Sequence, residues 1–371
     1  TGYGNFYYAP DTGFLAMCAG NLPVADAVDP AQTDDDYPQK LFNTIIYTGD
    51  NGGSFTTGFQ PDLVWVKRRD GDQSNGLWDS SRGTTKILIS NESDAEGTSS
   101  GLTSFDSTGY TMGTYYNQTG NTYVSWSWRA NGGSSSNSDG ATSSTVQAAP
   151  GGGFSIVTYT GFAGASGTST VGHGMGVAPN MIIYKSRSRA SGWWTAAPGL
   201  FSSQSHFIDL NGTGQPTDLS SYGTMSAPTT SVFSINGVDG VGGESATYVA
   251  YCFANIEGFC KVGTYAGNGN TDGAFIYTGF KPKFILFKRT NRSGDFWYII
   301  DPVRNPYNGP GSRLLNADRS VGESGNATTD VIDIVSNGFK IRTSGSGLNG
   351  SGGEWIWLAM AHNPFKYATA R

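Results

Sequence analysis

Nearly continuous apolar segments occur at three places in the chain, each shortly after a glycine and a proline. They are LVWVK in GFQPDLVWVK, MIIYK in GVAPNMIIYK and FILFK in GFKPKFILFK, which end at Lys67, Lys185 and Lys288. An unbroken apolar run of this length indicates a strand that is buried on both faces. Proline fixes φ and donates no hydrogen bond, so it suits the start of a strand, and the glycine before it permits a turn with positive φ.

A second kind of segment alternates polar and apolar positions and closes each repeat. The predicted strands cover residues 122–128, 247–253 and 355–360. In TYVSWSW, alternation places Val124, Trp126 and Trp128 on one face of the strand and the residues between them on the other. The prolines Pro61, Pro179 and Pro282 recur at intervals of about 100 residues, which is the size of a whole domain rather than of a solenoid repeat.

These patterns predict an all-β protein of three tandem homologous antiparallel β-sandwich domains with an extended N-terminal segment. The predicted boundaries are 1–40 for the N-terminal segment and connector, 41–133 for repeat 1, 134–153 for a Gly/Ser linker, 154–260 for repeat 2 and 261–371 for repeat 3. The linker is assigned because glycine, serine, asparagine and alanine dominate it. The 54 glycines and the aromatic content of 13% suit strands joined by tight turns.

Charge and cysteine content narrow the function classes. The net charge is −6, and the short basic clusters, Lys67–Arg69 and residues 185–189, are interpreted as strand-end residues held in water, so no nucleic acid is expected as a partner. Three cysteines and three isolated histidines form no disulfide framework and show no metal-ligand spacing, so neither metal nor cofactor is expected. No apolar run approaches the roughly 20 residues that cross a bilayer, which predicts no membrane insertion.

Few residues offer catalytic chemistry, and the chain is predicted not to be an enzyme. Asp79 and Arg82 recur as Asp301 and Arg304, which favours a structural ion pair, and repeat 2 has Ala-Ala-Pro at the equivalent place. Asp34–Asp36 are interpreted as a solvated acidic turn, with calcium ligands or glycosidase carboxylates as alternatives. His173 is interpreted as a turn residue bonded to the backbone, with a ligand or acid–base role as the alternative.

Contact with a ligand is expected from aromatic residues and from loops that differ between the repeats. Trp193 and Trp194 are adjacent on a predicted strand, so one of them could face outward and stack on a sugar, although core packing is the other interpretation. The variable loops cover residues 70–76, 114–121, 201–224 and 305–324. The candidate glycan or partner contacts are Trp193, Trp194, Tyr115, Tyr116, Tyr222 and Tyr307.

The repeats also resemble a known family. The run from Phe42 to Ala130, with FNTIIYTG, GFQPDLVWVKRRD and NTYVSWSWRANGG, is similar to the repeated domain of virion proteins of tailed bacteriophages, many of them marine phages or cyanophages. The segments FSIVTYTG and TDGAFIYTGFKPKFILFKRT carry the resemblance through the second and third repeats. Thr1–Leu22 resembles the end of a SPRY-like β-sandwich that precedes such repeats.

The resemblance implies a non-enzymatic virion structural protein, a tail fibre or exposed fibre that serves host attachment by binding surface glycans. Repetition would lengthen a spike and multiply weak contacts. The implied partners are other virion proteins and host surface polysaccharide. A homo-oligomer is expected, with a trimer favoured by analogy with phage fibres, located in the virion after synthesis in the host cytoplasm. The alternatives are a capsid decoration or baseplate protein that binds only virion proteins, and a polysaccharide depolymerase with two facing acidic residues.

Overall fold

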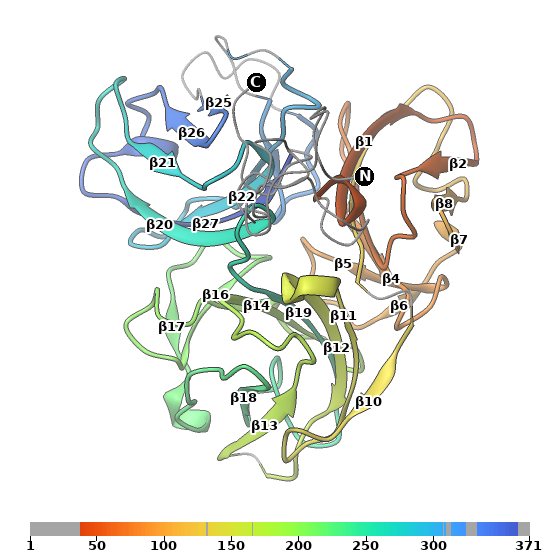
Figure 1. The fold of residues 1–371 in the computed structure, drawn as a ribbon, viewed down its shortest axis with the longest axis vertical. Coiled ribbons are helices and arrows are strands. Elements are labelled where there is room, and N and C mark those ends of the chain that lie inside the picture. Colours follow the sequence, from red (N-terminus) through yellow and green to blue (C-terminus); the bar gives the residue numbers. More distant parts are fainter. Residues whose placement is uncertain are drawn as a thin grey trace, which may run out of the picture.

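The repeats form three lobes arranged around a common centre (Figure 1). The computed structural model describes residues 38–130, 133–164, 166–306, 308, 313–323 and 332–362. We call the lobes module 1 (within 38–130), module 2 (within 133–254) and module 3 (within 260–362). Each module pairs a large antiparallel sheet near the centre with a small antiparallel sheet on the outside, so the all-β sandwich prediction is confirmed.

Module 1 has a large sheet in the order β1-β9-β3-β4-β5-β6 and a small sheet in the order β2-β8-β7. The strands of the large sheet are β1 (Phe42–Thr48), β3 (Leu63–Arg68), β4 (Gly76–Asp79), β5 (Lys86–Ile89), β6 (Gly97–Thr98) and β9 (Thr122–Trp128). Those of the small sheet are β2 (Gly53–Thr56), β7 (Leu102–Asp106) and β8 (Gly109–Met112), and a 3-10 turn, η3 (Pro38–Lys40), precedes β1.

Module 2 has a large sheet in the order β10-β11-β12-β19-β14-β15-β16-β17 and a small pair, β13-β18. The large sheet contains β10 (Ser135–Asn137), β11 (Ser144–Ala148), β12 (Phe154–Thr160), β14 (Met181–Ser186), β15 (Trp194–Ala196), β16 (His206–Asp209), β17 (Thr217–Asp218) and β19 (Thr247–Phe253). The pair is β13 (Thr168–Gly172) and β18 (Val232–Asn236), and η4 (Pro150–Gly152) and η5 (Ser220–Tyr222) are short 3-10 turns.

Module 3 has a large sheet in the order β20-β27-β22-β23-β24 and a small sheet in the order β21-β26-β25. The large sheet contains β20 (Cys260–Ala266), β22 (Pro282–Arg289), β23 (Tyr298–Ile300), β24 (Leu315–Asn316) and β27 (Glu354–Ala361). The small sheet contains β21 (Phe275–Tyr277), β25 (Ile332–Val335) and β26 (Gly338–Ile341). A short helix, α1 (Ser346–Asn349), lies in a glycine-rich segment before β27.

The repeated apolar strands β3, β14 and β22 occupy the same place in the three large sheets, each beside the closing strand of its own module. The glycines before them, Gly58, Gly176 and Gly279, have φ of 90°, 73° and 87°. A residue with a side chain rarely adopts this conformation, so the predicted turn geometry is confirmed at these three glycines.

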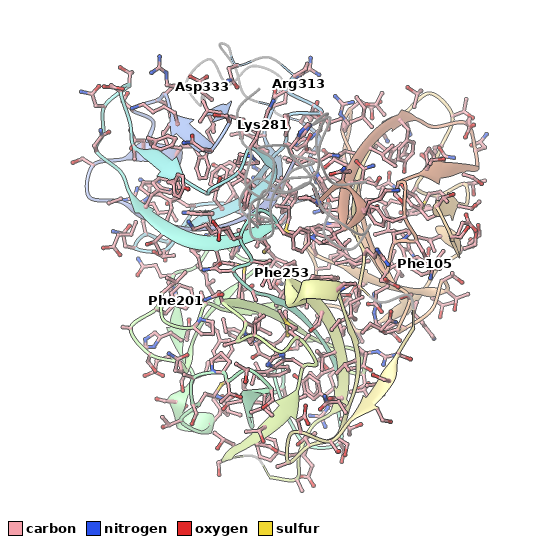
Figure 2. The ribbon with its side chains drawn as sticks, in the orientation of Figure 1. Phe105, Phe201, Phe253, Lys281, Arg313 and Asp333 are labelled. Carbon is pink, nitrogen blue, oxygen red and sulfur yellow. The ribbon has the colours of Figure 1, made fainter. Side chains whose placement is uncertain are left out.

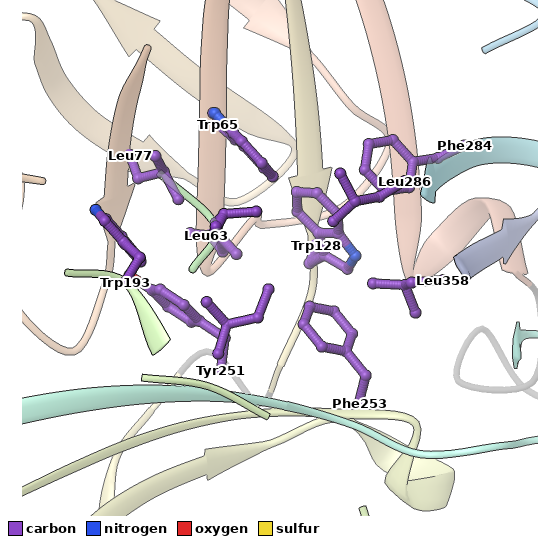
Figure 3. Close-up of a pocket in the computed structure, with 12 residues that line it drawn as sticks. Leu63, Trp65, Leu77, Trp128, Trp193, Tyr251, Phe253, Phe284, Leu286 and Leu358 are labelled. Atoms are coloured by element: carbon purple, nitrogen blue, oxygen red, sulfur yellow. The ribbon is translucent and has the colours of Figure 1, made fainter. Parts of the chain in front are cut away.

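Each large sheet is buried on both faces, which explains the continuous apolar runs. In β3, Val64 and Val66 pack against the small sheet of their own module, whereas Leu63 and Trp65 point the other way. The second face contributes to a core that all three modules share. Figure 3 shows Trp128 of module 1, Phe253 of module 2 and Leu358 of module 3 directed toward one another around a cavity of about 20 Å³.

The arrangement corrects two expectations. Residues 134–153 were expected to be a flexible linker, but they form β10 and β11, and β11 pairs with β12 along its whole length. Serine and threonine hydroxyls can lie at the solvated edge of a sheet, so a polar composition did not exclude strands here. The repeats also share one core, so the picture of a line of sandwiches that lengthens a spike is wrong for these three modules.

Candidate functional site

The modules meet at three seams, which we name seam 1–2, seam 2–3 and seam 3–1 after the modules they join. Strand register identifies equivalent residues in the three modules. The fourth residues of LVWVK, MIIYK and FILFK pair with Gly76, Trp194 and Tyr298. The residues just before these partners, Asn75, Trp193 and Trp297, are therefore equivalent. Each donates a side-chain hydrogen bond across a seam: Trp193 to the Ile89 carbonyl at 2.8 Å, Trp297 to the Asp209 carbonyl at 2.6 Å and Asn75 to the Asn316 carbonyl at 3.2 Å. The three acceptors are themselves equivalent, so the modules are related by an approximate threefold axis.

The lysines that end the repeated strands are buried at these seams, contrary to the expectation that Lys67 and Lys185 lie in water. Lys67, Lys185 and Lys288 have no exposed surface. Lys67 donates to the Arg319 carbonyl across seam 3–1 at 2.7 Å, and Lys185 donates to the Ser93 carbonyl across seam 1–2 at 2.9 Å. Loss of solvation lowers the pKa of Lys67 to about 7 and the pKa values of Lys185 and Lys288 to about 8.

Two of the seams are sealed by buried ion pairs. Within module 1, Arg82 lies 2.5 Å from Asp79, and both side chains are fully buried. Arg82 also contacts Glu96, which binds Arg187 of module 2 at 2.8 Å. The predicted structural ion pair is therefore confirmed, and it belongs to a network that joins modules 1 and 2.

Seam 3–1 repeats this network with equivalent residues. Arg304 lies 2.6 Å from Asp301 and contacts Glu323, which binds Arg69 of module 1 at 2.7 Å. Burial alone would raise the pKa of Glu323, but the hydrogen bond from Arg69 and the charge of Arg304 outweigh it and hold the pKa below its ordinary value. Glu96 in seam 1–2 has a lowered pKa for the same balance of reasons.

Seam 2–3 lacks every member of this network. The positions equivalent to Asp79, Arg82 and Glu96 hold Ala197, Leu200 and Pro216, and Thr290 stands where Arg69 and Arg187 stand. Proline also lacks the amide with which Glu96 and Glu323 bind the backbone of the next module.

A pocket of about 480 Å³ opens where the network is missing. Leu200 and Phe201 line it from module 2, and its other lining residues, including Thr264, Thr290 and Glu354, belong to module 3. Figure 2 shows Phe201 at the junction of the two lobes. The pocket combines apolar surface, hydroxyl groups and one carboxylate, which are the groups that contact sugars, so it is our candidate functional site.

The structure separates the predicted contact residues into buried and exposed ones. Trp193 and Tyr116 are buried, with 0% and 1% exposure, so they cannot contact a ligand: Trp193 packs in the shared core and Tyr116 against Trp78. Trp194 is partly buried and packs edge-on against Phe207 inside module 2. Core packing is thus the correct alternative for both tryptophans.

Tyr115 and Tyr222 are exposed, at 55% and 42%, but they belong to different modules and lie outside the pocket lining. Tyr307 lies outside the described residues, as do Asp34–Asp36 and the SPRY-like segment. Among the variable loops, residues 70–76 bind residues 316–320 across seam 3–1, for example from the Gln73 amide to the Ser320 carbonyl. Those loops are therefore used inside the molecule.

Sequence reasoning missed two exposed aromatic residues on β21. Phe275 and Tyr277 are 49% and 59% exposed, while Ile276 between them is buried. Lys261 lies 4.9 Å from the centre of the Tyr277 ring, beside a second pocket of about 270 Å³. The alternation in AFIYT is the signal that could have indicated them.

Other candidate groups are structural. His173 accepts a hydrogen bond from the Met175 amide at Nδ1 and lies 3.1 Å from the Thr229 carbonyl at Nε2, and burial lowers its pKa, so the predicted backbone-bonded turn residue is confirmed. Cys252 and Cys260 are buried free thiols. Nowhere in the described ranges do three or more His, Cys, Asp or Glu side chains gather as metal ligands would. No helix in the described part of the chain is long and apolar enough to span a membrane.

Comparison with known proteins gives a family without an assigned activity. No curated protein and no solved structure matches the chain. One family model, described as a domain of unknown function (DUF7483), matches residues 37–364 and so spans all three modules as a single unit. The chain therefore belongs to the DUF7483 family.

Proposed function

We propose that this chain is a non-enzymatic bacteriophage virion structural protein, a tail fibre or exposed fibre component that contacts host surface glycans. The single observation that carries the proposal is the open pocket at seam 2–3, in a molecule whose other two seams are sealed. The resemblance of the repeats to phage virion proteins supplies the biological setting. Assembly as a homo-oligomer, with a trimer favoured by analogy with phage fibres, is part of the proposal.

The chemistry of the pocket supports binding of a neutral sugar. Thr264 and Thr290 offer hydroxyl groups, Glu354 offers an acceptor, and Phe201 offers a ring edge or face for the apolar side of a pyranose. The arginines that would attract an anionic ligand at the other seams are replaced by Leu200 and Thr290. A neutral or weakly charged glycan therefore fits better than a phosphorylated one.

The same lining favours binding over hydrolysis. Glycoside hydrolysis generally needs two carboxyl groups that face each other across the bond. Glu354 is the one carboxylate that lines the pocket, and the buried acids Asp79 and Asp301 are held by arginines inside the molecule.

A specific observation also favours the alternative of a virion protein that binds only other virion proteins. Phe275 and Tyr277 project from the small outer sheet of module 3 and would suit an apolar protein contact. This surface is separate from the pocket at seam 2–3, so variants can distinguish the two functions.

The test is binding of the purified chain to an array of bacterial surface polysaccharides, with released reducing ends assayed in the same samples. We expect saturable binding without release of sugar ends. Thr290→Arg inserts into the open seam the residue type that fills the other two, and it should weaken binding at least about tenfold, equivalent to about 1.4 kcal/mol. Tyr115→Ala and Tyr222→Ala should leave binding unchanged.

Other outcomes would redirect the assignment. Binding that survives Thr290→Arg but is lost in Tyr115→Ala or Tyr222→Ala would move the contact to the exposed loops. If the folded wild-type chain binds no glycan, and Tyr277→Ala prevents its incorporation into virions, the alternative of a purely architectural protein is correct. Release of sugar ends would show a depolymerase.

A further inference from the structure

Seam 3–1 departs from the threefold pattern at the residue that crosses it. The equivalent positions hold tryptophan in modules 2 and 3, Trp193 and Trp297, but asparagine in module 1. Asn75 is fully buried, and its side-chain oxygen accepts a hydrogen bond of 2.6 Å from Lys67 Nζ. Of the three lysines that end the repeated strands, Lys67 is the one that is hydrogen-bonded to a buried carboxamide.

A second departure occurs at the same seam. In each module a side-chain oxygen accepts a hydrogen bond from the main-chain N–H of the residue that crosses the seam. The N–H of Asn75 is bound by Asn91, that of Trp193 by Asn211 and that of Trp297 by Asp318. These three acceptors occupy equivalent positions, two residues after Ile89, Asp209 and Asn316. Asp318 is thus an acid where the other modules have an amide. Its side chain is 9% exposed, and its Oδ2 is buried without a hydrogen-bond partner among the described residues.

The two departures meet around Lys67. The Asn75 carboxamide binds the main chain on both sides of Asp318, at the carbonyls of Ala317 and Arg319, and Lys67 Nζ binds the same Arg319 carbonyl. Burial lowers the pKa of Lys67, and the charge of Asp318 opposes that effect. Lys288 and Arg319 are the cations that act on Asp318.

We propose that Lys67 and Asn75 form an intramolecular isopeptide bond, with Asp318 as the acid that assists the reaction. Nucleophile and electrophile are in hydrogen-bond contact in a buried site, and Asp318 lies between the two residues whose carbonyls bind the Asn75 carboxamide. Such an arrangement makes an otherwise slow amide exchange effectively unimolecular. The proposal stands independently of the glycan-binding function.

The reaction balances without any co-reactant. The neutral Lys67 amine attacks Cγ of Asn75, the carbon that carries the oxygen to which Nζ is already hydrogen-bonded. The Asp318 carboxyl donates to Oδ1 as negative charge develops there. The bond from Nζ to Cγ forms, one proton passes from Nζ to Nδ2, the bond from Cγ to Nδ2 breaks, and ammonia leaves.

The protonation states support this chemistry. Loss of solvation lowers the pKa of Lys67 to about 7, and the same cause raises the pKa of Asp318 to about 7. Near neutral pH a substantial fraction of the amine is therefore free to attack, and a substantial fraction of the acid holds its proton. Neither condition holds for these groups in water.

The surrounding hydrogen bonds tolerate the loss of ammonia. The Ala317 carbonyl keeps its 2.7 Å hydrogen bond from Ser90 Oγ when Asn75 Nδ2 departs. The Arg319 carbonyl keeps the hydrogen bond from Nζ, which remains an N–H donor in the product. Departure of Nδ2 removes its hydrogen bonds across the seam to the Asn316, Ala317 and Arg319 carbonyls, which are 3.2, 3.0 and 3.2 Å long.

The test is the mass of the full chain, purified and incubated at neutral pH. We expect a mass about 17 Da below that of the sequence, because ammonia leaves when lysine attacks the carboxamide. Trypsin should fail to cut after Lys67, and peptide 41–68 should remain linked to peptide 70–82. Lys185 and Lys288, which face no carboxamide, serve as internal controls and should be cut normally.

Two variants test the assigned roles. Lys67→Met should abolish the mass loss, whereas Lys185→Met should leave it unchanged. Asp318→Asn restores the residue type found in the other modules and should slow formation of the bond by about 100-fold or more. Far-UV circular dichroism and a melting curve establish that each variant is folded.

Two results would overturn the proposal. A folded wild-type chain that keeps its full sequence mass would show that Lys67 and Asn75 are only hydrogen-bonded. Asn75 precedes Gly76, so cyclisation to a succinimide would also remove ammonia, but it would leave no linked peptides and normal cleavage after Lys67.

Discussion

Buried charge at single residues distinguishes the three seams. Arg82 and Arg304 are fully buried, and each touches two acids, one in its own turn and one that also binds the next module. An isolated charge would be very costly at such a site, so each residue is tolerated only with its partners. The third seam shows that the fold can form the same junction with Ala197 and Leu200.

This leads to a prediction about Arg82→Leu, which copies the residue at the equivalent position of module 2. The substitution leaves Asp79 buried without its cation and leaves Glu96 with Arg187 alone, so we expect a loss of about 3–5 kcal/mol in the free energy of unfolding. Urea denaturation of the purified variant measures it.

The matched control is the double variant Asp79→Ala with Arg82→Leu, which copies both residues of module 2. It should recover part of the loss because no unpaired Asp79 remains, although Tyr251 loses its 2.7 Å hydrogen bond to that carboxylate. A double variant less stable than Arg82→Leu would contradict this account of the ion pair.

At the scale of elements, strand positions followed from the sequence because alternation and apolar runs report burial directly. β9 and β19 have the bounds expected from alternation, and β27 extends the expected strand by one residue at each end. The second face of β3, β14 and β22 was the part that could not be assigned. A continuous apolar run shows that both faces are covered, but it does not show that the cover comes from other repeats.

A sequence pattern does not show which other segment will cover a residue or pair with it. For this reason the predictions that Lys67 and Lys185 lie in water and that residues 134–153 form a linker were wrong. A lysine after an apolar run normally reaches water, and here the carbonyl groups of the adjacent module take the place of water. For the candidate site, the repeated Asp–Arg pair was visible in the sequence. The pocket was not visible, because it forms where two modules that lack the ion-pair residues meet. The sequence does not show that Leu200 of module 2 and Thr290 of module 3 lie at the same seam.

The cross-seam hydrogen bonds give a prediction at this scale. Trp193→Phe keeps an aromatic ring in the shared core but leaves the Ile89 carbonyl without the indole donor, which should cost about 1–3 kcal/mol of stability beyond the lost volume. Trp65→Phe is the control, since Trp65 lies in the same core and its Nε1 has no hydrogen-bond partner among the described residues.

Chemical denaturation of both variants makes the comparison. We expect Trp193→Phe to unfold at a clearly lower denaturant concentration than Trp65→Phe. Equal losses would mean that the hydrogen bond across seam 1–2 contributes nothing measurable and that ring volume alone decides the stability.

The whole molecule should unfold as one unit, because the three large sheets share a core and no module buries its inner face alone. We predict one calorimetric transition, with the calorimetric enthalpy equal to the van't Hoff enthalpy. Separate transitions for the modules, or a stable monomeric fold of residues 133–254 expressed alone, would show instead that the repeats are independent domains.

The approximate threefold axis also changes how the repeats are understood. Three copies in one chain allow each seam to diverge, which three identical subunits could not do. Seam 1–2 has the ion pairs and a tryptophan that donates a hydrogen bond across it. Seam 3–1 has the ion pairs and an asparagine in the place of the tryptophan. Seam 2–3 lacks the ion pairs. Divergence of this kind leaves a pocket at seam 2–3, where the ion pairs are missing, and places the buried Lys67–Asn75 contact at seam 3–1.

The packing of η3 against β27 has a mechanical consequence. Phe42, just after η3, contacts Phe284, which pairs with Met360 near the end of β27, so the described chain begins and ends at the same place. The path from residue 38 to residue 362 runs once around the axis and returns. Residues 38 and 362 therefore lie close together in space, although more than 300 residues separate them in the sequence. A force applied to both ends of the described chain would act first on seam 3–1, where module 1 meets module 3. Seams 1–2 and 2–3 would bear the force only after seam 3–1 had opened.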